Sequence, residues 1–81
     1  KVWVEELNDE LSLSLPVSES YESLGGLIIE RLGHIPHPGE SVYIQESHIS
    51  LVVTQMLSRR IVKVKLIQHT IEDDSSGGSR R

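Results

Sequence analysis

Apolar residues near the start of the chain recur with the spacing of one helix face. Val4, Leu7 and Leu11 share such a stripe and predict a short helix over about 4–11. Two glutamates occupy the first turn of this helix, where carboxylates suit the positive end of the helix dipole. The polar connector that follows, 12–20, carries a Leu-Pro pair, which favours an extended backbone entering the next element.

A second apolar stripe predicts the central helix of the chain. Ser23 is placed to cap its start, and Gly33 follows its last apolar residue, where a left-handed conformation is easiest without a Cβ. Pro36 and Pro38 then prevent the helix from resuming. The stripe consists of Leu24, Leu27, Ile28 and Leu32.

Three later runs have the patterns of strands. Val42 and Ile44 alternate with polar residues, and 49–57 is apolar on both faces in its middle, as expected of a central strand. The run 61–68 alternates again. Its core-facing residues are expected to be Val62, Val64 and Leu66, with Lys63 and Lys65 on the outer face.

The order of these elements predicts an α+β fold with two layers. Two short helices should pack on one face of a three-stranded antiparallel meander, with Leu13 and Leu15 of the connector reaching the core. We expect one domain over 1–69, because 70–81 is too polar to fold alone and is predicted to be a disordered tail.

Two adjacent glycines, Gly25 and Gly26, stand near the start of the central helix. Each costs about 1 kcal/mol relative to alanine in a helix interior, so another segment is expected to approach closely there. A phosphate-binding loop is the alternative. It would need a G-x-G-x-x-G spacing after a strand or a neighbouring lysine, and the sequence has neither.

Composition limits the chemistry that the chain can perform. It has no cysteine, which excludes disulfides, thiol catalysis and cysteine zinc sites. No apolar run approaches the roughly 18 residues of a membrane-spanning helix. Together with a start at Lys1, this predicts a fragment of a longer protein that does not itself cross a membrane.

Charge is divided unevenly along the chain. Residues 1–40 carry eight carboxylates against two cations, whereas 41–70 carry one carboxylate against four cations. The helical half is therefore acidic and the strand half basic. Nucleic-acid binding is not predicted, because a larger basic excess interleaved with aromatic residues is typical of it.

No residue pattern indicates an active site. His34 and His37 are three apart, but a metal site needs three or four donors, and the other two histidines lie far away in the sequence. No serine is paired with a histidine and a carboxylate in a recognisable motif. We therefore expect no enzyme activity, no cofactor, no bound metal and no catalytic residue.

The chain resembles the CorC/HlyC transporter-associated domain. The family pattern has a Leu-Asn pair on a short helix, a Leu-Pro, a Tyr-x-Thr-x-Gly-Gly helix, a Leu-Gly-x-Ile-Pro turn and a Gly-Glu or Gly-Asp before three strands. A serine takes the threonine position here. The matching residues are Leu7, Asn8, Leu15, Pro16, Tyr21, Ser23, Gly25, Gly26, Leu32, Gly33, Ile35, Pro36, Gly39 and Glu40.

The resemblance implies a regulatory or interaction module at the cytoplasmic C-terminus of a membrane ion transporter. Proteins of this family are linked to magnesium or cobalt efflux or are hemolysin-like, and usually carry CBS domains just upstream. The partners implied are those CBS domains and the membrane domain of the same parent, and weak homodimers are also expected. The alternative is a small ligand-binding or catalytic domain.

The resemblance also raises a question about the sheet. The family domain normally begins with a strand upstream of the first helix, and at most Val2 and Trp3 could represent that strand here. An N-terminal strand that is missing or truncated would leave one edge of the sheet open, and another chain can complete such an edge.

Overall fold

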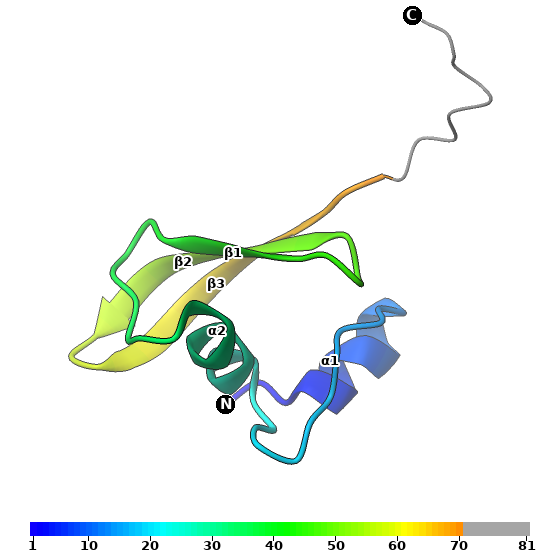
Figure 1. Cartoon of the computed structure of the whole chain (residues 1–81), viewed down its shortest axis with the longest axis horizontal. Coiled ribbons are helices and arrows are strands. Elements are labelled where there is room, and N and C mark those ends of the chain that lie inside the picture. Colours follow the sequence, from blue (N-terminus) through cyan, green and yellow to red (C-terminus); the bar gives the residue numbers. More distant parts are fainter. Residues whose placement is uncertain (71–81) are drawn as a thin grey trace, which may run out of the picture.

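The computed structural model describes residues 1–70 and confirms the α+β fold (Figure 1). The tail predicted over 70–81 lies outside the described residues, apart from Thr70. The boundary of the domain therefore stays a prediction. The elements are α1 (Val4–Leu11), α2 (Leu24–Leu32), β1 (Ser41–Ile44), β2 (Ile49–Leu57) and β3 (Arg60–Gln68).

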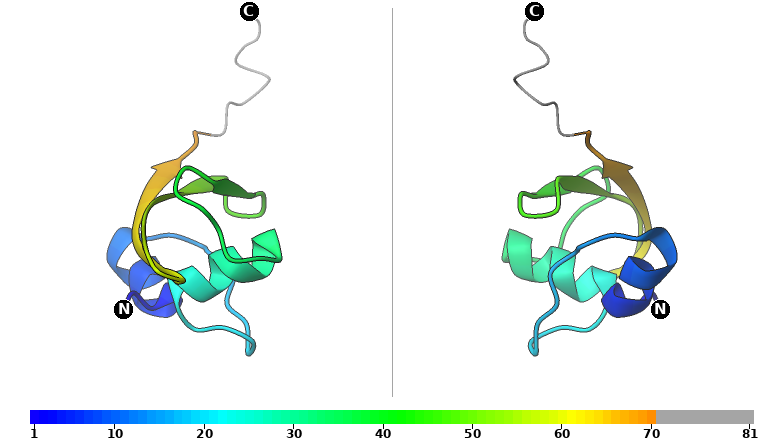
Figure 2. Two further views of the ribbon diagram at one scale, coloured as in Figure 1. Left: turned by 90° about the vertical axis from the view of Figure 1, so that its left-hand side faces the viewer. Right: turned by 90° about the vertical axis from the view of Figure 1, so that its right-hand side faces the viewer.

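The three strands form an antiparallel sheet in the order β1-β2-β3, so β1 and β3 are its edges. Both helices lie on the same side of this sheet (Figure 1). The end-on views in Figure 2 place α1 near β3, whereas α2 runs beneath the sheet toward β1. The other side of the sheet carries no element of the described chain.

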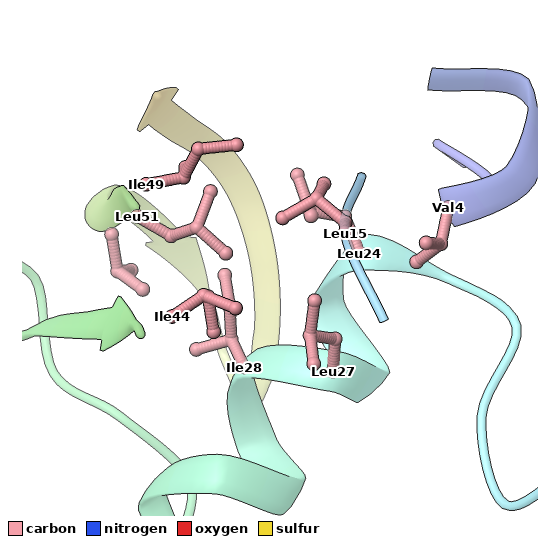
Figure 3. Close-up of a cluster of buried hydrophobic side chains, with 9 residues drawn as sticks. Val4, Leu15, Leu24, Leu27, Ile28, Ile44, Ile49 and Leu51 are labelled. Atoms are coloured by element: carbon pink, nitrogen blue, oxygen red, sulfur yellow. The ribbon is translucent and has the colours of Figure 1, made fainter. Parts of the chain in front are cut away.

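A single aliphatic core joins α2 to the sheet. Leu27 and Ile28 are fully buried and face Ile44 and Leu51 of the strands (Figure 3). The α1 end of this core is narrower, because only one residue of that helix is buried. The buried residues are Val4, Leu15, Leu24, Leu27, Ile28, Ile44, Ile49, Leu51 and Val53.

One core assignment on β3 is wrong. Val62 was expected to face the core, but it is 47% exposed, and Ile61 packs against the core in its place. The cause is a pair of irregularities in the β2–β3 ladder, where neither Thr54 nor Val62 has a partner across the strands. Each extra residue reverses the alternation of its own strand, so Met56 and Ile61 turn inward together.

A second correction concerns Leu11, which shares a helical stripe with Val4 but is 52% exposed. It is the last residue of α1, and the chain turns immediately afterwards at Ser12, which has a left-handed φ of 56°. Leu7 of the same stripe is partly buried against the core. Only the first two turns of the apolar face of α1 are therefore covered.

Residues 2–4 pair with the entry to α2 and do not join the sheet. Trp3 forms an isolated antiparallel bridge with Ser23. On either side of it, the Val4 amide donates to the Glu22 carbonyl at 2.8 Å and the Leu24 amide donates to the Val2 carbonyl at 2.9 Å. The sheet of the described chain thus has three strands.

The ends of α2 form as predicted. The Ser23 hydroxyl accepts a hydrogen bond from the Gly26 amide at 3.1 Å, and Gly33 ends the helix with φ 81°. The two glycines differ in their surroundings. A Cβ on Gly26 would lie 2.9 Å from the Cβ of Tyr21, whereas one on Gly25 would meet Ile61 at an ordinary 3.8 Å.

This difference predicts opposite effects of one methyl group at neighbouring positions. Gly25→Ala should leave stability unchanged or raise it, because alanine favours a helix by about 1 kcal/mol over glycine. Gly26→Ala should lower the free energy of unfolding by about 1–3 kcal/mol relative to Gly25→Ala, because Tyr21 must shift. Urea unfolding of both variants measures the difference, and equal stabilities would show that the approach of Tyr21 is not a packing constraint.

Candidate functional site

Two residues that match the family pattern, Asn8 and Tyr21, hold the connector by hydrogen bonds. We call these two side chains the clamp. The Asn8 side chain donates to the Leu15 carbonyl at 3.0 Å and accepts from the Leu15 amide at 2.9 Å. Both backbone groups of a buried leucine are thereby satisfied without a neighbouring strand. The partner of Asn8 lies seven residues away, and no local pattern in the sequence indicates it.

Tyr21 holds the same connector at Pro16, the residue directly after Leu15. Its hydroxyl donates to the Pro16 carbonyl at 2.9 Å. Burial raises the pKa of the Tyr21 hydroxyl, so this donor stays protonated at neutral pH. Asn8 and Tyr21 together hold the connector between the two helices.

A second group of residues that match the family pattern shapes the turn between α2 and β1. Gly39 has φ 98°, and its amide donates to the Val53 carbonyl at 2.7 Å. The Val53 amide in turn donates to the Glu40 carbonyl at 2.8 Å, and Pro36 is buried beneath the turn. These matching residues thus fall into two groups, one around the connector and one at this turn. Four further matching residues, Leu7, Ser23, Gly25 and Gly26, help to line an apolar groove between β3, α1 and the start of α2.

The His34 ring makes two polar contacts within this turn. Its Nδ1 lies 3.1 Å from the Leu32 carbonyl oxygen and its Nε2 lies 3.0 Å from Glu40 Oε1. His37 is exposed and has no side-chain hydrogen bond to another group of residues 1–70. Across these residues, no three histidine and carboxylate side chains are grouped so that they could hold a metal ion.

The outer side of the sheet holds a polar cluster that the sequence did not reveal. Ser50 Oγ lies 2.7 Å from His69 Nε2, and the Tyr43 hydroxyl lies 3.3 Å from His48 Nδ1. The rings of Tyr43 and His69 meet edge to face at 5.5 Å. Strand register brings Tyr43 beside Ser50 across β1 and β2, and the backbone bond from His69 to His48 brings His69 next to them. Within residues 1–70 no carboxylate bonds the Ser50–His69 pair, so it is not a catalytic triad.

An exposed ion pair links α2 to the β1–β2 turn. Arg31 Nη2 lies 2.6 Å from Glu46 Oε2. The hydrogen bond from Arg31 lowers the pKa of Glu46, and the bond to Glu46 raises the pKa of Arg31. The ion pair therefore adds to the stability of the fold at pH values above the ordinary pKa of a glutamate. This stabilisation is lost as the pH falls through the lowered pKa of Glu46. Its effect is small because both groups are in solvent.

Oppositely charged surfaces lie on the two layers. An acidic hollow of about 490 Å³ opens between the start of α1 and the loop before α2. It includes the partly exposed ring of Trp3, over which the Lys1 ammonium lies at 5.5 Å. Its four carboxylates are Glu5, Glu6, Glu19 and Glu22. The cations of the sheet are all exposed and belong to β3 and its turn, namely Arg59, Arg60, Lys63 and Lys65.

Known proteins match this chain in both sequence and structure. The family model described as the transporter-associated domain, CorC_HlyC, matches residues 1–69. A putative DUF21 domain-containing chloroplastic protein of Arabidopsis thaliana is 37% identical over 41 residues, which are 51% of this chain. The match spans only 6% of the length of that relative. No helix within residues 1–70 is long and apolar enough to cross a membrane.

Three solved structures share the fold. The putative Mg²⁺ and Co²⁺ transporter (CorC) associated region of Neisseria meningitidis is 28% identical with a TM-score of 0.73, covering 84% of this chain and 80% of that one. A conserved putative domain from the same organism is 25% identical with a TM-score of 0.73, covering 85% and 90%. A CorC_HlyC domain from Haemophilus ducreyi, 20% identical over 86% and 90% of the chains, has a TM-score of 0.69 and supports the fold alone.

The family match extends from the N-terminal bridge through the clamp, both helices and all three strands. It covers the residues that hold the connector and those that shape the turn before β1. The chain therefore belongs to the CorC/HlyC family of transporter-associated domains.

Proposed function

We propose that this domain is a non-catalytic regulatory module at the cytoplasmic C-terminus of a CorC/HlyC-type membrane ion transporter. The family match over residues 1–69 is the observation that carries the proposal. The Neisseria neighbour described as a Mg²⁺ and Co²⁺ transporter associated region supports a divalent metal ion as the cargo. The module modulates the movement of that ion and does not carry it.

The distribution of charge supports docking as the means of regulation. The acidic hollow belongs to the helical layer, between the start of α1 and the loop before α2, whereas the exposed cations belong to β3 and its turn in the sheet layer. Complementary charge steers the orientation of a docking partner more than it adds affinity. The partners we propose are the CBS domains and the membrane domain of the same parent, with a second copy of the module as a weak partner.

Deleting the module from the intact transporter tests the regulatory role. In vesicles, the variant ending before the module should keep basal ion flux and lose the response of flux to cytosolic ligand, because only docking is removed. A variant in which a Gly/Ser linker of equal length replaces the module controls for the shortened chain. Unaltered flux and response would refute regulation, and loss of basal flux alone would indicate a role in folding or assembly.

Self-association of the isolated domain should be weak and sensitive to salt. Sedimentation equilibrium is expected to show dimers at 50 mM salt that dissociate at 500 mM, because screening shortens the reach of surface charges to a few ångströms, about 3 Å at 1 M. Lys63→Glu with Lys65→Glu should abolish dimers at low salt, whereas Lys63→Arg with Lys65→Arg should retain them. Dimers that persist at high salt would contradict a contact steered by charge.

A further inference from the structure

The outward edge of β3 is unpaired in the described chain. Val53 exchanges hydrogen bonds with Gly39 and Glu40 on the β1 side, so its neighbour Val52 directs its backbone toward β3. Val52 pairs with Lys65, which makes Lys65 one of the β3 residues bonded to β2.

The same alternation fixes the direction of the neighbouring groups. The His69 amide donates to the His48 carbonyl at 2.9 Å. The backbone groups of Lys65 and of every second residue after it therefore face β2. Val64 and Leu66 therefore direct their N–H and C=O groups away from β2. Within residues 1–70, no other backbone group bonds them. These four polar groups form a ready template for an added strand.

An apolar groove of about 730 Å³ runs beside this edge, between β3, α1 and the start of α2. The half-exposed Leu11 forms part of its wall, and Figure 2 shows α1 lying below the β3 side of the sheet. Its apolar lining includes Leu7, Leu11, Ile29, Ile61, Val64 and Leu66.

Every charged residue that lines the groove is a cation: Lys1, Arg59 and Arg60. The outer side of the same strand adds Lys63 and Lys65, both exposed. A second copy pairing β3 to β3 would bring lysines of both chains onto one face, and like charges across a strand pair are destabilising. Charge therefore disfavours this chain as its own edge partner.

We infer that the β3 edge and its groove bind an extended peptide segment in which apolar and acidic residues alternate. Residues opposite Val64 and Leu66 place their side chains over the groove, where apolar groups bury its wall. Residues opposite Lys63 and Lys65 project on the outer side, where carboxylates pair with the ammonium groups. The edge supplies the backbone hydrogen bonds, and the alternation supplies specificity.

Three eight-residue peptides with blocked ends test this inference: one alternating Val and Glu, one alternating Val and Lys, and one with four Val followed by four Glu. Fluorescence anisotropy should show binding of the first, with the other two at least about tenfold weaker. The bound peptide should slow hydrogen exchange of the Val64 and Leu66 amides. Equal binding of the Val/Lys peptide, or protection elsewhere only, would overturn the inference.

Matched variants locate the contact. Lys63→Glu with Lys65→Glu should reverse the preference, favouring the Val/Lys peptide, and because both sites are exposed the fold is retained. Leu11→Ser should weaken binding, whereas Val17→Ser, which removes a 56% exposed side chain outside the groove, should not. Equal effects of the two serine variants would contradict a role for the groove. Protection of Val64 and Leu66 that rises with protein concentration alone would assign the edge to a second copy.

Discussion

The arrangement of the whole domain depends on the backbone pairing of residues 2–4 with the entry to α2. The Val4–Glu22 and Leu24–Val2 hydrogen bonds fix the start of α1 against the start of α2. Residues 2–4 therefore pair with the entry to α2 and not with a strand of the sheet. This pairing holds α1 beside the β3 edge, where the helix makes no extensive contact with a strand. The open edge and its groove follow from that position.

The hydrogen bonds of Asn8 and Tyr21 also fix the connector between α1 and α2. Asn8 satisfies the backbone of Leu15, and this allows a buried leucine to enter the core from a segment with no regular structure. An unsatisfied buried amide or carbonyl would cost about 1–3 kcal/mol each. The hydroxyl of Tyr21 holds the same connector at Pro16. The hydrogen bonds of Asn8 and Tyr21 therefore support the core where the connector enters it.

The sequence predicted the helices and strands well because the residues that determine each element lie within it or next to it. The apolar stripe of α2, its serine cap and its terminal glycine all lie within ten residues of one another, and the structure uses all three. The misassigned Val62 shows the limit. Its strand alternates without interruption in sequence, and the irregularities that turn Val62 outward arise from pairing with β2. The expected burial of Leu11 was wrong for a related reason. Periodicity shows which face of a helix is apolar, but it does not show which part of that face another segment covers.

The candidate surfaces were harder to predict than the fold. The acidic and basic halves were visible in the sequence, but the groove needs the positions of α1, α2 and β3 together. The cluster of Tyr43, Ser50 and His69 depends on strand register in the same way. No spacing along the chain encodes these contacts.

Amide hydrogen exchange of the free domain tests the open edge most directly. Val64 and Leu66 should exchange much faster than Lys65 and Ile67 of the same strand, because only the latter pair donates to β2. The comparison is internal to one strand, so global stability affects all four amides alike. Equal protection of the four amides at low protein concentration would contradict an unpaired β3 edge.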